Sequence, residues 1–194
     1  MPLLHRIKPL LNRLKTIFLL AIILATSNVV AEQPPINTGP ELGAKLPVIS
    51  VVDQFGDKQN LSNAMRENGV VLVLFRSADW CPFCKRHLLE LNEVVGQFKQ
   101  KGYGVVAISY DSAKILRKFS QTKKLKFSLW SDQQVKTFKA FDVVNTEHEP
   151  SDRHYGIPYP GVIVVNKNRQ VIHKYFFEGY KKRVKFKTLL KELL

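Results

Sequence analysis

Apolar and polar residues alternate along the chain with two different periods, and the change of period predicts strands and helices in turn. Nearly unbroken apolar runs, which are typical of buried strands, lie at residues 46–52, 69–76, 103–110 and 127–130. Two more runs, 161–165 and 170–177, flank a turn at 166–169 and predict a hairpin. The chain is therefore expected to form a sheet of at least six strands.

Helical periodicity fills the intervals between these strands. Residues 82–100 carry one apolar stripe, made up of positions 84, 88, 91, 95 and 98. A second helix is expected to begin at Asp111 or Ser112. Its inward-facing residues are predicted to be Ile115, Leu116 and Phe119. With a short helix at 133–141 and a basic amphipathic helix at the C-terminus, this order predicts an α/β protein whose mixed sheet has helices on both faces.

The N-terminus has the composition of an export signal. Four basic residues and no acid precede the apolar run 17–25, and Val29 and Ala31 suit the positions that a signal peptidase recognises. Cleavage is expected after Ala31. A permanent membrane anchor facing the periplasm is the alternative, but the apolar run is much shorter than the ~20 residues that span a bilayer. The mature chain is thus expected to be periplasmic or secreted, where thiols can be oxidised.

Length and charge narrow the possibilities further. Removing the first 31 of 194 residues leaves 163, enough for one domain at 41–194 behind a Pro- and Gly-containing linker at 32–40. Losing the four basic residues of the signal lowers the net charge from +14 to about +10. The basic residues are dispersed, and residues 180–194 are interpreted as a solvated helix face. No platform of stacking aromatic residues accompanies the charge, so nucleic acid is not expected as a partner.

The two cysteines of the chain, Cys81 and Cys84, lie where a buried strand gives way to a helix. Pro82 suits the first helical position, where its missing N–H is not needed. The free N–H groups at the helix start favour a thiolate at Cys81, and Cys84 lies one turn further on the same face. Cys81 is therefore the candidate nucleophile, and Cys84 is the candidate resolving thiol.

Two other uses of a cysteine pair can be compared with this one. A structural disulfide that closes so small a loop adds little stability, and a structural zinc site usually needs four ligands. The histidines of the mature chain are scattered, and His87 at the edge of the helical stripe is interpreted as a surface residue. Periplasmic copper binding, with imidazole from His148, His154 or His173, stays an alternative of another class; no metal or other cofactor is expected.

Several segments together resemble a known family. They are LFRSADWCPFCKRHLLELNEV, GVVAISYDS, WSDQQVKTFKAF and GIPYPGVIVVNKNRQV, spread over residues 43–180. They are similar to thioredoxin-like redoxins of the alkyl hydroperoxide reductase/thiol-specific antioxidant (peroxiredoxin-like) family. The resemblance implies a thioredoxin-like fold and an antioxidant thiol oxidoreductase. Such an enzyme acts on protein or small-molecule thiols and disulfides together with a redox partner protein. Contact with a membrane is expected only through the signal peptide before it is cleaved.

The resemblance also implies a substrate groove beside the cysteines. Thioredoxin-fold proteins place a cis-proline before the strand that faces the active site, and Pro160 matches that position. The implied groove is formed by Trp80, Pro82, Tyr159 and Pro160. The backbone of Tyr159 is expected to pair with an extended substrate segment.

The sequence departs from the family at positions that matter for chemistry. Peroxiredoxins have a threonine three residues before the reactive cysteine and a proline three residues before that, where this chain has Ala78 and Phe75. Thioredoxins bury an acid at the latter position. The departures favour thiol–disulfide exchange by Cys81 and Cys84, with reduction of hydrogen peroxide or organic hydroperoxides as the alternative.

Two further features near the site are left open by the sequence. Peroxiredoxins use an arginine near the position of Tyr159, and Arg76 and Arg153 are the nearby candidates here. The polar segment 142–155 precedes Pro160 and is interpreted either as solvated chain or as a lid that supplies a charged side chain.

Overall fold

A computed structural model describes residues 35–193, so the expected signal at 1–31 lies outside the described residues. The described chain forms one seven-stranded sheet with the order β2-β1-β5-β4-β3-β6-β7. The strands are β1 Val51–Asp53, β2 Lys58–Gln59, β3 Gly69–Leu74, β4 Tyr103–Ser109, β5 Ser128–Ser131, β6 Gly161–Asn166 and β7 Val171–Phe176. The helices are α2 Leu61–Ala64, α3 Pro82–Gln100, α4 Ala113–Lys123, α5 Lys136–Ala140 and α6 Phe186–Glu192.

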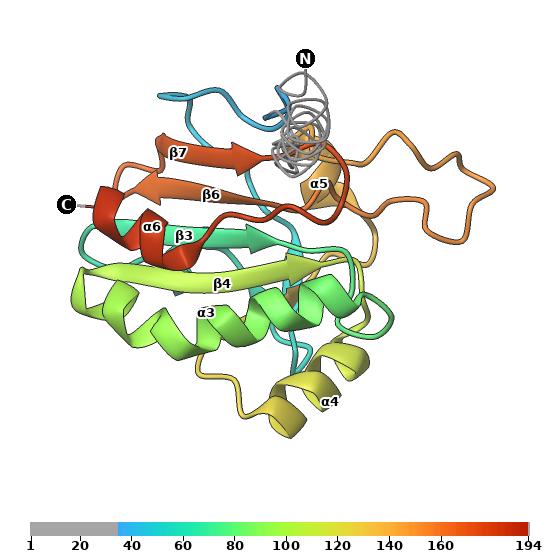
Figure 1. Cartoon of the computed structure of the whole chain (residues 1–194), viewed down its shortest axis with the longest axis horizontal. Helices are drawn as coiled ribbons and strands as arrows, with labels where there is room; N and C mark the ends of the chain where they lie inside the picture. Colours follow the sequence, from blue (N-terminus) through green and yellow to red (C-terminus); the bar gives the residue numbers. More distant parts are fainter. Residues whose placement is uncertain (1–34, 194) are drawn as a thin grey trace, which may run out of the picture. The chain divides into compact units, whose positions relative to one another are not determined.

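The sheet is mixed, as the sequence predicts. Strand β3 pairs in parallel with β4 and antiparallel with β6, and β6 and β7 form the expected hairpin. Helices α3, α4 and α6 pack on one face, where Figure 1 shows α3 and α6 in front of the central strands. Helices α2 and α5 contribute to the apolar cluster on the other face. Because both faces of β3 are covered, all six of its residues are buried and its sequence is continuously apolar.

The helix at 82–100 has the bounds that its periodicity predicts, and the five stripe positions are all buried. Its first residues lie at the carboxyl ends of β3 and β4, and segment 142–155 projects from the same end of the sheet (Figure 1). The segment is irregular, as expected. This end of the sheet therefore brings together the cysteines and the polar loop that precedes Pro160.

Other elements are shorter than the apolar pattern predicts. The strand expected at 46–52 begins only at Val51. Leu46 and Ile49 are buried but lie in irregular chain, where the Leu46 N–H donates to the carbonyl of Arg169. The short helix α2 and strand β2 were not expected from the sequence. The carbonyl of Ala64 in α2 approaches the backbone of β4 so closely that a Cβ on Gly104 would lie 1.6 Å from its oxygen, which explains the glycine there.

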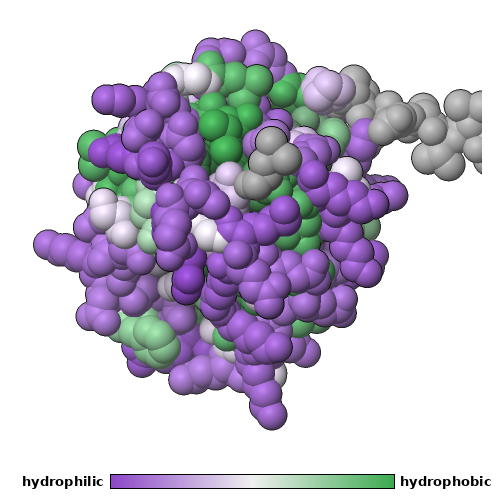
Figure 2. Space-filling view, turned by 90° about the vertical axis from the view of Figure 1, so that its left-hand side faces the viewer, coloured by the Kyte–Doolittle hydropathy of each residue, from purple (hydrophilic) through white to green (hydrophobic). Residues whose placement is uncertain are grey.

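The first described residues pack along the hairpin edge. The N–H of Ile36 donates to the carbonyl of Phe176 at 3.2 Å, and that of Gly39 donates to the carbonyl of Asp142 at 3.0 Å. Among residues 35–193, no helix has the length and apolar composition needed to cross a membrane. On the face shown in Figure 2, hydrophilic side chains surround small apolar patches.

His87 is a buried residue of the main core, so its interpretation as a surface histidine is wrong. Its ring stacks on Phe186 with 4.3 Å between ring centroids, and its Nε2 lies 3.0 Å from the carbonyl oxygen of Val184. Burial lowers the pKa of His87 to about 4. The sequence misleads here because α6, which covers this edge of the stripe, comes from the distant C-terminus.

Candidate active site

Cys81 and Cys84 are joined by a disulfide at the start of α3. Cys81 is the N-cap of the helix, Pro82 is its first residue, and the backbone N–H of Cys84 donates to Cys81 Sγ at 3.2 Å. The local geometry is thus the one expected from the Cys-Pro-Phe-Cys sequence. In the reduced protein the same N–H would donate to a thiolate at Cys81 and stabilise it.

Both sulfurs are covered. Cys81 is 2% exposed and Cys84 is fully buried, and both belong to the main apolar cluster together with the side chains of α3. Trp80 and Phe83 are half-buried and pack against this cluster. The surface that Cys81 presents to a substrate in the disulfide form is therefore small.

Asp111 holds the loop that leads from β3 to Cys81. Its buried carboxylate accepts hydrogen bonds from the Ser77 hydroxyl at 2.8 Å, the Ala78 N–H at 2.7 Å and the Ser109 hydroxyl at 3.0 Å. Burial raises the pKa of Asp111, and the hydrogen bonds oppose that rise. The sequence suggested Asp111 only as a helix cap; the cap is Ser112, which leaves Asp111 free to hold the cysteine loop.

Trp80 connects the loop to two other segments and also contacts Arg76 of the loop itself. Its Nε1 donates to the Tyr110 hydroxyl at 3.1 Å, and its ring lies 4.4 Å from the ring of His154 between centroids. The guanidinium carbon of Arg76 lies 4.8 Å from the Trp80 ring centroid. Trp80 is thus next to the cysteines, as expected, and its ring contacts segment 142–155.

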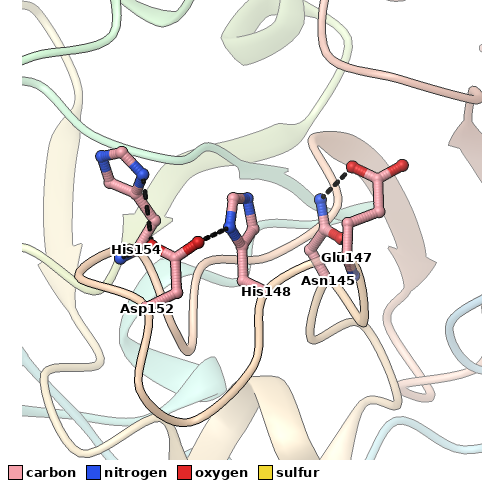
Figure 3. A network of polar contacts seen from close by, with 5 residues as sticks. All are labelled: Asn145, Glu147, His148, Asp152 and His154. Carbon is pink, nitrogen blue, oxygen red and sulfur yellow. Dashed lines mark hydrogen bonds and ion pairs between the residues drawn. The ribbon is translucent and has the colours of Figure 1, made fainter.

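A polar network gives this segment its shape (Figure 3). His148 Nδ1 lies 2.8 Å from one oxygen of Asp152, and His154 Nδ1 lies 3.7 Å from the other. The Asn145 amide donates to Glu147 at 3.3 Å. The hydrogen bond with His148 is the main cause that lowers the pKa of Asp152.

The histidines named for copper binding are only partly brought together. Potential ligand atoms of His148, Asp152 and His154 lie within 4.8 Å of one another, and neither cysteine belongs to this group. The ring of His173 lies instead beside Tyr175, with 6.2 Å between centroids. The copper alternative needs both thiolates and at least one of these imidazoles, and no such group of potential ligand atoms is found among residues 35–193.

Arg183 is the site residue that the sequence interpretation missed. Its Nη2 lies 3.9 Å from Cys84 Sγ, although residues 180–194 were interpreted as a solvated helix face. The helix begins only at Phe186, so Arg183 lies in extended chain that returns over the start of α3. Burial, and next the nearby charge of Arg76, lower the pKa of Arg183 to about 10. Of the two arginines that the sequence offered as candidates near the site, Arg76 lies close enough to Arg183 to act on its charge, whereas Arg153 is exposed.

The expectation of a cis peptide bond before Pro160 is wrong, because the described residues contain none. The N–H of Tyr159 donates to the carbonyl of Val143 at 2.8 Å, so the trans chain pairs with its own loop and that donor is not available to a substrate. Tyr159 packs against the cluster on the far face of the sheet. Pro160 precedes Gly161, which pairs with Leu74, so this proline lies at the end of β3 that leads to the cysteines.

The two positions that depart from the family are core residues. Phe75 is 1% exposed and Ala78 is 4% exposed, and both belong to the cluster that contains the cysteines. Neither side chain can donate a hydrogen bond or accept a proton. Among the described residues, the groups that donate to the sulfurs are the N–H of Cys84 and the guanidinium of Arg183.

Comparison with known proteins finds similar sequences among peroxiredoxins and thiol-disulfide oxidoreductases. The chain is 32% identical to the chloroplastic peroxiredoxin Q of Sedum lineare over 126 residues, which are 65% of this chain and 63% of the relative. It thus spans less than two thirds of that relative. It is 24% identical to the thiol-disulfide oxidoreductase ResA of Bacillus cereus over 145 residues, 74% of this chain and 75% of the relative.

The fold has a close match in a solved structure. The peroxidoxin BcpB of Mycobacterium tuberculosis superposes with a TM-score of 0.68 at 21% identity, covering 79% of this chain and 96% of that one. The fold is therefore thioredoxin-like, as expected. The family model named AhpC/TSA matches residues 42–174. This match covers more than half of the chain and includes Cys81 and Cys84, so the chain belongs to the AhpC/TSA family.

Proposed function

We propose that the protein is a thiol–disulfide oxidoreductase that cycles Cys81 and Cys84 between dithiol and disulfide. The observation that carries this proposal is the disulfide between the N-cap of α3 and the residue three positions later. The two sulfurs already hold the geometry of the oxidised state without any third residue. The same sequence places a thiolate-stabilising N–H against Cys81 in the reduced state.

The reaction follows from these positions. In the reduced protein, the Cys81 thiolate attacks one sulfur of a substrate disulfide, and the first substrate thiolate leaves. Cys84 then attacks the Cys81 sulfur of the mixed disulfide and releases the second thiolate. Two electrons pass to the substrate, and the Cys81–Cys84 disulfide forms. Arg183, 3.9 Å from Cys84 Sγ, stabilises the thiolate that performs the second attack.

Peroxide reduction is the second candidate, and the similarity to peroxiredoxin Q favours it. Against it, Ala78 offers no hydroxyl to the reacting oxygen, and the sulfur of Cys81 is covered. Arg183 lies beside Cys84 rather than in contact with Cys81. A disulfide substrate that opens the site when it binds suits this arrangement better than a free peroxide does.

The test compares the two reactions on one protein. We expect kcat/KM for reduction of a disulfide, bis(2-hydroxyethyl) disulfide, to exceed kcat/KM for hydrogen peroxide and for cumene hydroperoxide when dithiothreitol is the reductant. Stopped-flow measurement of Trp80 fluorescence follows single turnovers of the reduced protein, with Trp80→Phe as the control for signal assignment. Faster oxidation by either peroxide than by the disulfide would make the peroxidase the primary function.

We also propose that the chain is exported and acts in an oxidising compartment. The basic residues before position 16, the apolar run 17–25 and Ala31 support an export signal. The expected result is a mature N-terminus at Glu32 in the periplasmic fraction of an expressing bacterium. N-terminal sequencing measures this directly, and an uncleaved chain in the membrane fraction would support the anchor instead.

A further inference from the structure

Two arginines lie next to the redox pair and close to each other. Arg183 Nη2 is 3.9 Å from Cys84 Sγ, and the guanidinium of Arg76 lies 4.8 Å from the ring centroid of Trp80 and 5.0 Å from that of Tyr180. The charge of Arg76 contributes to the lowered pKa of Arg183. Two like charges are thus held together in a partly desolvated place, which is unfavourable unless an anion compensates them.

Within the described chain, residues 35–193, neither arginine has a carboxylate as an ion-pair partner. Arg76 Nε is buried and has no hydrogen-bond partner among these residues. Burial lowers the pKa of Arg76, and the nearby Tyr180 and Glu147 only oppose that fall. The Glu147 carboxylate accepts a hydrogen bond from Asn145. A buried N–H without an acceptor is unfavourable, so the arrangement is explained best by a ligand that supplies the acceptor.

The surroundings of Arg76 orient its guanidinium without consuming its donors. The group lies near the faces of Trp80 and Tyr180, contacts that arginine makes through its flat face and that leave its N–H edge available. Tyr180 is 43% exposed, so this edge of the site borders solvent. Trp80 directly precedes Cys81, so the guanidinium of Arg76 contacts the neighbour of the reactive cysteine.

We propose that Arg76, beside Arg183, is an anion site that selects thiol and disulfide substrates carrying a carboxylate close to the reacting sulfur. The proposal rests on the proposed function and names its substrate class. Arg76 binds the carboxylate through its planar fork, which matches two carboxylate oxygens. Arg183 faces the sulfur and stabilises the Cys84 thiolate, so the two guanidinium groups serve different anions of one reaction.

The chemical step is ordinary exchange. The Cys81 thiolate attacks the sulfur that bears the carboxylated group, the other substrate thiolate leaves, and Cys84 displaces the carboxylated thiolate as the enzyme disulfide forms. A dithiol reductant returns two electrons to Cys81 and Cys84. The carboxylate keeps its charge throughout, and it affects the selection of the substrate only through its position relative to Arg76.

A series of disulfides of similar size tests the selection. Dithiodiglycolate carries carboxylates, bis(2-hydroxyethyl) disulfide is neutral and cystamine is cationic. Each enzymatic rate is divided by the rate of the same disulfide with free dithiothreitol, which removes differences in leaving group. We expect the wild type to prefer the anionic over the neutral disulfide by about tenfold or more, a difference of about 1.4 kcal/mol, and to disfavour the cation.

Matched variants assign the preference to the site. Arg76→Met is expected to reduce the anionic preference, which is a ratio of two rates measured on the same protein, to less than about twofold. Arg86→Met removes the same charge from an exposed arginine of α3, whose guanidinium lies 5.5 Å from the Phe83 ring, and should keep the preference. Arg76→Lys, which keeps the charge but loses the fork, serves if Arg76→Met is poorly folded, and an intermediate preference is expected.

The outcomes separate the anion site from the proposed function. Equal normalised rates for the three disulfides would overturn the anion site and leave the oxidoreductase standing. If the wild type reduces none of them, the proposed function fails, and binding of unreactive (methylthio)acetate decides the anion site. Arginine side-chain NMR should then show a saturable shift of the Arg76 Nε–H signal that Arg86→Met retains. A shift that does not saturate would overturn the site.

The same chemistry can come from a small molecule or from a protein. Peptide disulfides with glutamate or glutamine beside the cysteine distinguish these sources. A preference for the glutamate peptide larger than that for dithiodiglycolate identifies an acidic segment of a protein. The reverse order identifies a small carboxylated thiol, and either order supports the site.

Discussion

Replacing Cys81 by serine is expected to lower disulfide reduction by at least about a thousandfold, because a serine hydroxyl is not ionised at neutral pH and cannot replace the thiolate nucleophile. The N–H groups at the start of α3 stabilise an anion at this atom and gain nothing from a neutral hydroxyl. Turnover of bis(2-hydroxyethyl) disulfide with dithiothreitol measures the loss. Residual activity above about one tenth of the wild type would exclude Cys81 as the nucleophile.

The partner variant Cys84→Ser provides the matched control. It keeps the nucleophile but lacks the thiol that resolves the mixed disulfide, so it should accumulate a covalent adduct with substrate at Cys81. Intact-mass spectrometry without reductant detects this adduct. If Cys81→Ser traps the adduct and Cys84→Ser does not, the roles of the two cysteines are reversed.

Acid is expected to destabilise the folded protein through His87. The folded state holds His87 neutral with its pKa lowered from 6.5 to about 4, whereas the unfolded chain binds the proton near 6.5. Between these values the unfolded state binds more protons, so the free energy of unfolding rises with pH and is lost as pH falls from about 6.5 to 4. The shift corresponds to a loss of about 3 kcal/mol over this window.

Urea unfolding of the wild type and His87→Leu between pH 4 and 7 measures this effect. The variant loses the contact with the Val184 carbonyl and is expected to be less stable at pH 7. Its stability should nevertheless depend less on pH, and the difference in slope isolates His87 from the other titrating groups. Parallel curves for the two proteins would show that His87 does not carry the acid sensitivity.

The parts of the site that depend on local sequence could be predicted. The Cys-Pro-Phe-Cys order specifies a helix start with Cys81 as its cap, and the apolar period over 82–100 specifies which face of that helix is buried. Both are properties of neighbouring residues. Trp80 likewise lies beside the cysteines because the chain connects them directly.

The remaining parts depend on contacts between distant segments. Arg183 is 99 residues from Cys84, and nothing in the basic run at 180–187 indicates that one of its cations turns inward. The position of Asp111 just before α4 suggested a helix cap. Its contact with the cysteine loop arises because the ends of the parallel strands β3 and β4 lie side by side, which the local sequence does not show. The environment of Tyr159 followed from the loop at Val143, which occupies its N–H, and no local pattern reveals that pairing.

The hydrogen bonds of Asp111 hold the loop before Cys81 in place independently of the redox state of the cysteines. The groups that donate to its carboxylate come from Ser77, Ala78 and Ser109, and neither cysteine is among them. Breaking the sulfur–sulfur bond therefore leaves these attachments in place, and the backbone ahead of Cys81 is tied to β4 in both states. The loop before Cys81 thus keeps its attachment to β4 through each redox cycle, and turnover does not require these hydrogen bonds to break and form again.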